Sequence, residues 1–151
     1  MAQVTASEVA KHILANFTAR GEAIGNLKLQ KLLYYTQGWH LALYCESLFD
    51  DRIEAWVHGP VVPGVFREYR EFKWTPIVTQ PGIVDLPRQV VDHIGEVLDV
   101  YEKFSPWDLE RMTHNEAPWK EARGPLPPDV PSNALINHES MRLFFTRQMN
   151  G

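Results

Sequence analysis

Residues 27–45 contain no aspartate or glutamate, and Lys28 and Lys31 carry the only full charges in this stretch. Leucine and aromatic residues recur through it at helical spacing, which predicts a helix that starts after Asn26 and runs to about Tyr44. A helix on the surface of a globular protein keeps a charged face toward water, so a helix this poor in charge must be buried on most of its sides. We therefore expect it to be the central element of the fold.

Cap and turn signals divide the rest of the chain into shorter elements. Thr5 and Glu8 have the spacing of a capping box and begin a helix over 6–19. Ser105 followed by Pro106 begins another, which ends near His114. The predicted strands form a hairpin of 48–49 with 53–57, which Gly59-Pro60 closes, and 77–78 is expected as a further strand beside it. Helices are predicted to start at Pro63 and Pro87, with one further helical turn over 118–123. An extended proline-rich connector over 124–133 then leads to a final helix capped by Asn137.

Together these elements predict a mainly α fold: a single compact helical domain of five to six helices with a small antiparallel β-hairpin. A chain of 151 residues has room for one such domain with a substantial core. We place the main domain at 1–123 and expect 124–151 to be a proline-rich connector and a C-terminal helix packed on the same domain. The expected core comprises Ile13, Leu14, Leu29, Leu33, Leu43, Trp56, Phe66, Tyr69, Val91, Ile94 and Leu98.

Charge and cysteine content restrict the partner and the compartment. The formal net charge is −4 and the isoelectric point about 5.8, which disfavours a nucleic-acid partner and leaves a basic protein partner open. The single Cys45 cannot form an internal disulfide and suits a reducing cytoplasm; we expect it to be a buried thiol of the central helix. No apolar run reaches the roughly 18 residues of a membrane span, and no leader pattern is visible. The sequence predicts a soluble cytoplasmic domain.

A search for catalytic chemistry finds no supporting pattern. The six histidines include no pair at the spacing of metal ligands, and Glu110 with His114 is better explained as a solvated ion pair or a cap contact. No nucleophile elbow, phosphate-cradling glycine loop or zinc-protease motif occurs. We therefore predict a protein that is not an enzyme and has no metal or cofactor.

Three sets of residues are candidates for partner binding. On the central helix Lys28, Lys31, Tyr35 and Trp39 align in a narrow strip, and tyrosine and tryptophan are common interface anchors. Binding through this strip requires accessible lysine heads and one accessible aromatic edge. The alternative is that both aromatic residues belong to the core while the lysines extend to water.

The second candidate is the turn at His58, Gly59 and Pro60, which follows a predicted strand. It has either a binding role or a purely structural one. The third is Thr113-His114 with Pro118-Trp119, for which the alternative is an aromatic lid packed on the helix that begins at Pro87.

Several short motifs occur in order between residues 7 and 122. They are Leu27–Tyr35, Gln37–His40, Leu48–Asp50, Glu54–Trp56, His58–Pro63, Thr113-His114 and Pro118-Trp119. In order and spacing they resemble the Panacea domain, a SocA-like antitoxin family that also includes phage-associated GepA-like proteins.

The resemblance implies a mostly helical domain that neutralises a cognate protein toxin by direct binding. In one branch of the family it also implies an adaptor that delivers the toxin to a Clp-type protease. It supplies no catalytic residues, and this chain shows no separate DNA-binding segment. The alternative is a phage-derived regulatory or nucleic-acid-associated protein, which would need a basic surface stripe; the sequence offers only Lys28, Lys31 and scattered arginines for one.

Overall fold

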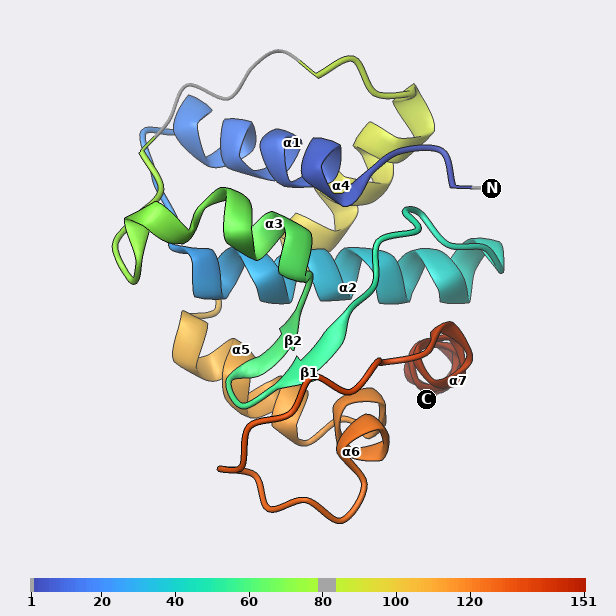
Figure 1. Ribbon diagram of the computed structural model, residues 1–151. Helices are drawn as coiled ribbons and strands as arrows, with labels where there is room; N and C mark the ends of the chain where they lie inside the picture. The colour runs from blue at the N-terminus through green and yellow to red at the C-terminus, as the bar shows by residue number, and fades with distance from the viewer. Residues whose placement is uncertain (1, 79–83) are drawn as a thin grey trace.

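The computed structural model describes residues 2–78 and 84–151, and the predicted central helix is its central element. This helix, α2, contacts α1, α3, β2, α4, α5 and α7 (Figure 1). The elements are α1 (Ala6–Ala19), α2 (Asn26–Tyr44), β1 (Glu54–Trp56), β2 (Gly59–Val61), α3 (Pro63–Glu68), a 3₁₀ turn (Arg70–Phe72), α4 (Arg88–Tyr101), α5 (Pro106–His114), α6 (Ala117–Arg123) and α7 (His138–Asn150).

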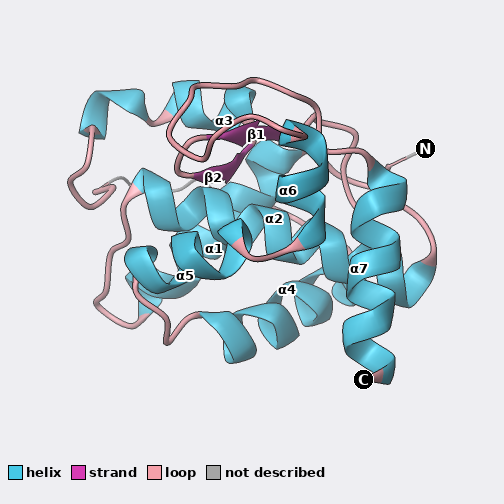
Figure 2. Ribbon diagram, turned by 90° about the horizontal axis from the view of Figure 1, so that it is seen from below, coloured by secondary structure: helices cyan, strands magenta, loops and turns pink. Residues whose placement is uncertain are grey.

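The prediction of a mainly α fold with a small antiparallel hairpin is confirmed (Figure 2). The described residues form seven α-helices rather than five or six, and α6, expected as a single turn, has seven residues. The predicted caps are present, with capping boxes at Thr5 and Ser105 and a side-chain cap at Asn137. No helix of the described residues is long and apolar enough to cross a membrane.

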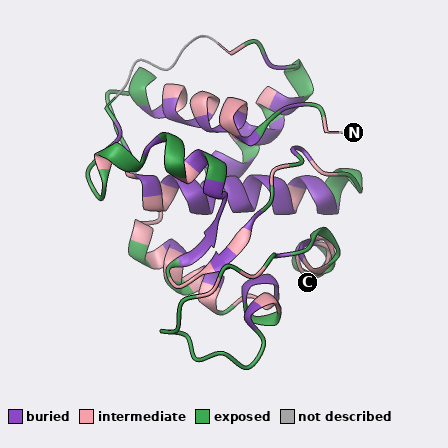
Figure 3. Cartoon of the chain, viewed as in Figure 1, coloured by how far each residue is buried: buried purple, intermediate pink, exposed green. Residues whose placement is uncertain are grey.

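Figure 3 shows α2 buried along nearly its whole length, polar residues included. The buried amides of this helix bind the backbone of segments that are not helical. Gln37 accepts from the amide of Leu48 at 2.7 Å and donates to the carbonyl of Phe49 at 2.7 Å, while Gln30 accepts from the amide of Val62 at 2.9 Å. A buried polar group without a partner costs about 1–3 kcal/mol, so these contacts fix where the loops lie on the helix.

The predicted hairpin pairing is wrong. The strands that pair are β1 and β2, joined by Val57 and His58, with Ala55 opposite Pro60. Proline has no amide hydrogen, but Ala55 directs its own amide away from Pro60, to the carbonyl of Ala134 at 2.8 Å. The proline therefore occupies a position of the ladder that needs no donor.

Two other segments expected in the hairpin lie elsewhere. Leu48 and Phe49 are held by Gln37 of α2 and do not pair as a strand. The amide of Ile77 donates to the carbonyl of Ile24 at 2.8 Å. The isolated bridge to Glu54 is formed instead by Leu135, which follows the connector.

The predicted core is largely confirmed. Its buried members are Ile13, Leu14, Leu29, Leu33, Tyr69, Ile94 and Leu98, whereas Trp56, Phe66 and Val91 are half-buried. Leu43 is a wrong prediction, since it is 44% exposed near the end of α2. Cys45 is exposed too, because the chain leaves the helix at this residue in a left-handed conformation (φ 58°). The expectation of a buried thiol is therefore wrong.

Helix α7 packs against α2 at a glycine. A Cβ atom built on Gly38 would lie 2.1–2.8 Å from three ring atoms of Phe145. That ring is 1% exposed and has edge contacts with Tyr34 and Tyr35, so it has little room to move.

We predict that Gly38→Ala lowers the free energy of unfolding by about 1–3 kcal/mol, because the overlap with Phe145 outweighs the higher helix propensity of alanine. Gly95→Ala is the matched control. It also lies inside a helix but has nothing within 4 Å of the added Cβ, so it should be neutral or stabilising by up to about 1 kcal/mol. Urea unfolding of both variants measures the difference, and equal stabilities would contradict the packing described here.

Candidate functional site

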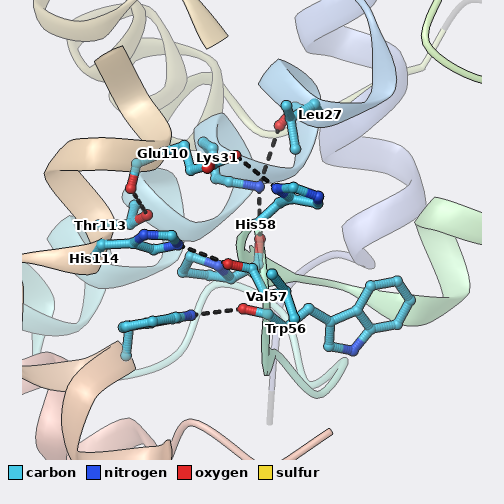
Figure 4. A network of polar contacts seen from close by, with 10 residues as sticks. Leu27, Lys31, Trp56, Val57, His58, Glu110, Thr113 and His114 are labelled. Carbon is cyan, nitrogen blue, oxygen red and sulfur yellow. Dashed lines mark hydrogen bonds and ion pairs between the residues drawn. The ribbon is translucent and has the colours of Figure 1, made fainter. Parts of the chain in front are cut away.

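The turn of residues 56–60 is held by side chains from α5 and α6. Nε2 of His114 donates to the carbonyl of Val57 at 2.8 Å, and Nε1 of Trp119 donates to the carbonyl of Trp56 at 2.8 Å (Figure 4). The two rings stack, with centroids 4.1 Å apart. His114 and Trp119, predicted from the sequence as a candidate pair, therefore position this turn rather than forming a lid on α4.

Behind the turn lies a fully buried lysine. Nζ of Lys31 is 3.5 Å from the carbonyl oxygens of Leu27 and Pro60, and its side chain is 0% exposed (Figure 4). Burial lowers the pKa of Lys31 to about 7, although the nearby carboxylate of Glu110 acts in the opposite direction. The lysine thus joins the first turn of α2 to β2 from inside the protein.

Gly59 is the one residue of this turn with a left-handed backbone, at φ +112°. A Cβ atom at this position would lie 2.6 Å from Cε of Lys31 and 2.9 Å from Oγ1 of Thr113. Both the conformation and the space require glycine. Gly59 and Pro60 are buried, so of the predicted turn residues His58 alone is exposed.

The predicted strip on α2 does not form one accessible surface. Lys31 and Tyr35 are both 0% exposed, so the expectation of accessible lysine heads is wrong for Lys31. The hydroxyl of Tyr35 donates to Glu116 at 2.8 Å, and its ring stacks on Tyr101 with centroids 4.0 Å apart. Desolvation raises the pKa of Glu116 to about 7, against the hydrogen bonds that its carboxylate accepts from Tyr34 and Tyr35.

The other two residues of the strip, Trp39 and Lys28, are half-buried and line different hollows. Nε1 of Trp39 donates to the hydroxyl of Tyr101 at 2.9 Å, in a hollow between α2 and α4. Nζ of Lys28 donates to the carbonyl of Glu102 at 2.6 Å, and the residue lines one hollow together with Trp74 and Trp107. The alternative interpretation, with aromatic rings in the core, thus describes Tyr35 fully and Trp39 in part.

The structure also reveals an aromatic surface that the sequence analysis missed. Trp74 and Trp107 are 72% and 68% exposed. Both side chains line each of two adjoining hollows, whose volumes are about 270 and 220 Å³. A third hollow of about 260 Å³ continues from Trp74 over β1 and α3. We call this surface the tryptophan groove; it consists of Leu27, Trp56, His58, Phe66, Trp74 and Trp107.

At the edge of the groove His58 is paired with Glu110. Nδ1 of His58 lies 3.0 Å from the carboxylate of Glu110, and the His58 ring meets Trp74 edge to face with centroids 6.3 Å apart.

One signal for this surface was present in the sequence, because Trp74 and Trp107 belong to no apolar stripe of a predicted helix. In the described residues no three metal-ligating side chains gather at one point.

The comparisons agree with the sequence resemblance. The family described as "Antitoxin SocA-like, Panacea domain" matches residues 29–120, and the chain belongs to this family. It is 42% identical over 136 residues to the protein named Antitoxin SocA of Caulobacter vibrioides (strain NA1000 / CB15N), an alignment that covers 81% of this chain and 72% of that relative. No solved structure matches. The matched range contains Lys31, the 56–60 turn and the residues of α5 and α6 that hold it.

We predict that Lys31→Met flattens the pH dependence of stability between about pH 7.5 and 9.5. A lysine in the unfolded chain has its ordinary pKa of 10.5 and stays protonated there, whereas the buried Lys31, whose pKa is about 7, loses its proton. The unfolded state then binds more protons, so wild-type stability rises with pH, by at most about 1.4 kcal/mol per pH unit from this one group.

Urea unfolding at several pH values in this window measures that slope. Lys120→Met removes an exposed lysine of α6 and should keep the wild-type slope. If the free energy of unfolding of the Lys31→Met protein rises with pH as steeply as that of the wild type, Lys31 is not the source of the pH dependence.

Proposed function

We propose that this protein is an antitoxin-like interaction module that neutralises a cognate protein toxin by binding it directly. Membership of the SocA-like family supports an antitoxin role. The observation that carries the proposal is the pair of exposed tryptophans at one groove, because tryptophan dominates the binding energy of many protein interfaces. In this proposal the protein acts in the cytoplasm, without catalysis.

The groove has a rigid base, which favours tight binding. The carbonyls of Trp56 and Val57 are each fixed by a side chain of α5 or α6, and Lys31 supports the turn from behind. A surface that is ordered before binding loses little conformational entropy when a partner arrives. In this proposal the buried residues that the sequence predicted to bind the partner, such as Lys31, act indirectly by positioning the exposed side chains of the groove.

Two of the predicted partner-binding residues, Lys28 and His58, line hollows of the tryptophan groove. We include both in the proposed contact surface, at its edge. Side chains at the edge of an interface act mainly on the rate of association, while central aromatic anchors determine how long the complex lasts. We therefore assign the larger share of the affinity to Trp74 and Trp107.

Co-expression with the neighbouring genes tests the proposal. One neighbour should arrest growth when expressed alone, and this protein should restore growth and co-purify with that neighbour's product. The half-life of the toxin separates two modes of action, because sequestration leaves the toxin stable whereas delivery to a Clp-type protease shortens its half-life in cells that contain the protease. If no neighbour is toxic, the antitoxin proposal loses its support.

We predict that Trp74→Ala and Trp107→Ala each weaken toxin binding by about 2 kcal/mol or more, roughly thirtyfold, with thermal stability nearly unchanged because both side chains are largely exposed. Val100→Ala is the matched control: this residue is 52% exposed but lines the separate hollow between α2 and α4. Isothermal titration calorimetry and growth rescue report the effect. Equal affinities for all three variants would place the interface elsewhere.

A further inference from the structure

We propose that the tryptophan groove binds an extended, proline-containing segment of the partner protein. This inference rests on the proposed function and specifies the chemistry that the groove recognises. It follows from the hydrogen-bonding groups of the groove, from the way the fold holds its own proline-rich connector, and from the contacts that already occupy Lys28, His58 and the edge of β1.

The first argument concerns the indole N–H groups. Three of the five tryptophans use theirs inside the protein: Trp39 donates to Tyr101, Trp56 to Glu54 and Trp119 to the carbonyl of Trp56. Within the described residues Trp74 and Trp107 have no such acceptor, and both are exposed at the groove. The groove thus combines apolar walls with two unused donors.

A segment that suits this surface offers carbonyl acceptors and few amide donors. Proline meets this requirement, because its nitrogen carries no hydrogen and its ring is apolar. Proline-containing segments also adopt the polyproline II conformation before binding, so little ordering is needed, and aromatic-lined grooves recognise them in several unrelated domains.

The second argument is that the fold already holds such a segment at one end of the groove. Pro131 and Ser132 of the connector line the hollow formed with Trp56, Phe66 and Trp74. Arg123 of α6 is buried and donates to carbonyls along the connector. Its Nη2 reaches the carbonyl of Pro127 at 2.9 Å and also that of Val130, while Nη1 binds the carbonyl of Ala55 at 3.1 Å.

The connector thus shows the features that we propose for the partner's segment: a donor from the domain meets its carbonyls, and Pro131 lines the same hollow as the aromatic side chains. The carbonyls of the connector are bound by Arg123 of the same chain. This argues against a second copy of the protein inserting its connector into the groove. Releasing the connector for that purpose would leave the guanidinium of the buried Arg123 without its carbonyl acceptors.

The third argument concerns the polar groups at the edge of the groove and the edge of the neighbouring strand. The amine of Lys28 donates to the carbonyl of Glu102, and Nδ1 of His58 lies 3.0 Å from the carboxylate of Glu110, so both side chains already have hydrogen-bond partners. The backbone of β1 is paired with β2 on one side and contacts residues 134–136 on the other, so it offers no open edge to a further strand. An extended segment without a need for β-pairing remains the best match.

Decaproline is the probe, and a glycine-serine peptide of the same length is its control. We titrate each into the full-length ¹⁵N-labelled protein and follow the five indole N–H signals, assigned with Trp→Phe variants. The expected result is a saturable shift of the Trp74 and Trp107 signals with decaproline, and none with the control peptide. Trp74→Ala should weaken decaproline binding at least tenfold, whereas Val100→Ala should leave it unchanged.

Three results would overturn the inference: no saturable shift at millimolar decaproline, equal binding of the two peptides, or shifts centred on Trp39. Sedimentation of the free protein adds a fourth, since a dimer that covers Trp74 would show that a second copy occupies the groove.

These results are separable from a failure of the antitoxin proposal. If the tryptophan variants lose toxin neutralisation while decaproline does not bind, the groove binds the toxin but the inference about proline is wrong. If decaproline binds at the groove while no neighbouring toxin is neutralised, the peptide site stands and the antitoxin function is wrong.

Discussion

The structure depends on one constraint, which is that α2 is buried on nearly every side and yet carries polar side chains. Gln30, Lys31 and Gln37 are each 0% exposed. Each of them satisfies a backbone group outside α2: Gln30 that of Val62 at the start of α3, Lys31 that of Pro60 in β2, and Gln37 those of the Leu48-Phe49 loop. A polar group withdrawn from water in this way must be paired, so these three contacts determine how the irregular parts of the chain are wrapped around the helix.

This constraint explains what the sequence could and could not predict. Helices whose signals are local were predicted well, because a capping box such as that of Thr5 and Glu8 is complete within a few residues. The hairpin was assigned wrongly because the partner of Leu48 is Gln37, a side chain and not a strand. Angular periodicity also failed for the strip of Lys28, Lys31, Tyr35 and Trp39, since it identifies a buried face only when the opposite face is exposed, and α2 has little exposed face.

The candidate site was partly predictable for the same reason. Short motifs identified the 56–60 turn and the residues His114 and Trp119, although not that they bind one another. The tryptophan groove could not be derived from spacing, because Trp74 follows the 3₁₀ turn whereas Trp107 lies in the first turn of α5. The two come together only where both lie beside the first turn of α2. Two exposed tryptophans remote in sequence become a surface only through the tertiary fold.

Glu110 connects the buried part of the site to its exposed edge. Its carboxylate pairs with His58 at the groove and, by its negative charge, also favours the protonated form of the buried Lys31. Moving this carboxylate away would remove that favourable charge, which lowers the pKa of Lys31 further and favours its neutral form. By linkage, the neutral lysine favours the arrangement with Glu110 displaced to the same extent. The buried lysine behind the turn and the carboxylate at the edge of the groove are therefore coupled through charge, although Lys31 itself is 0% exposed.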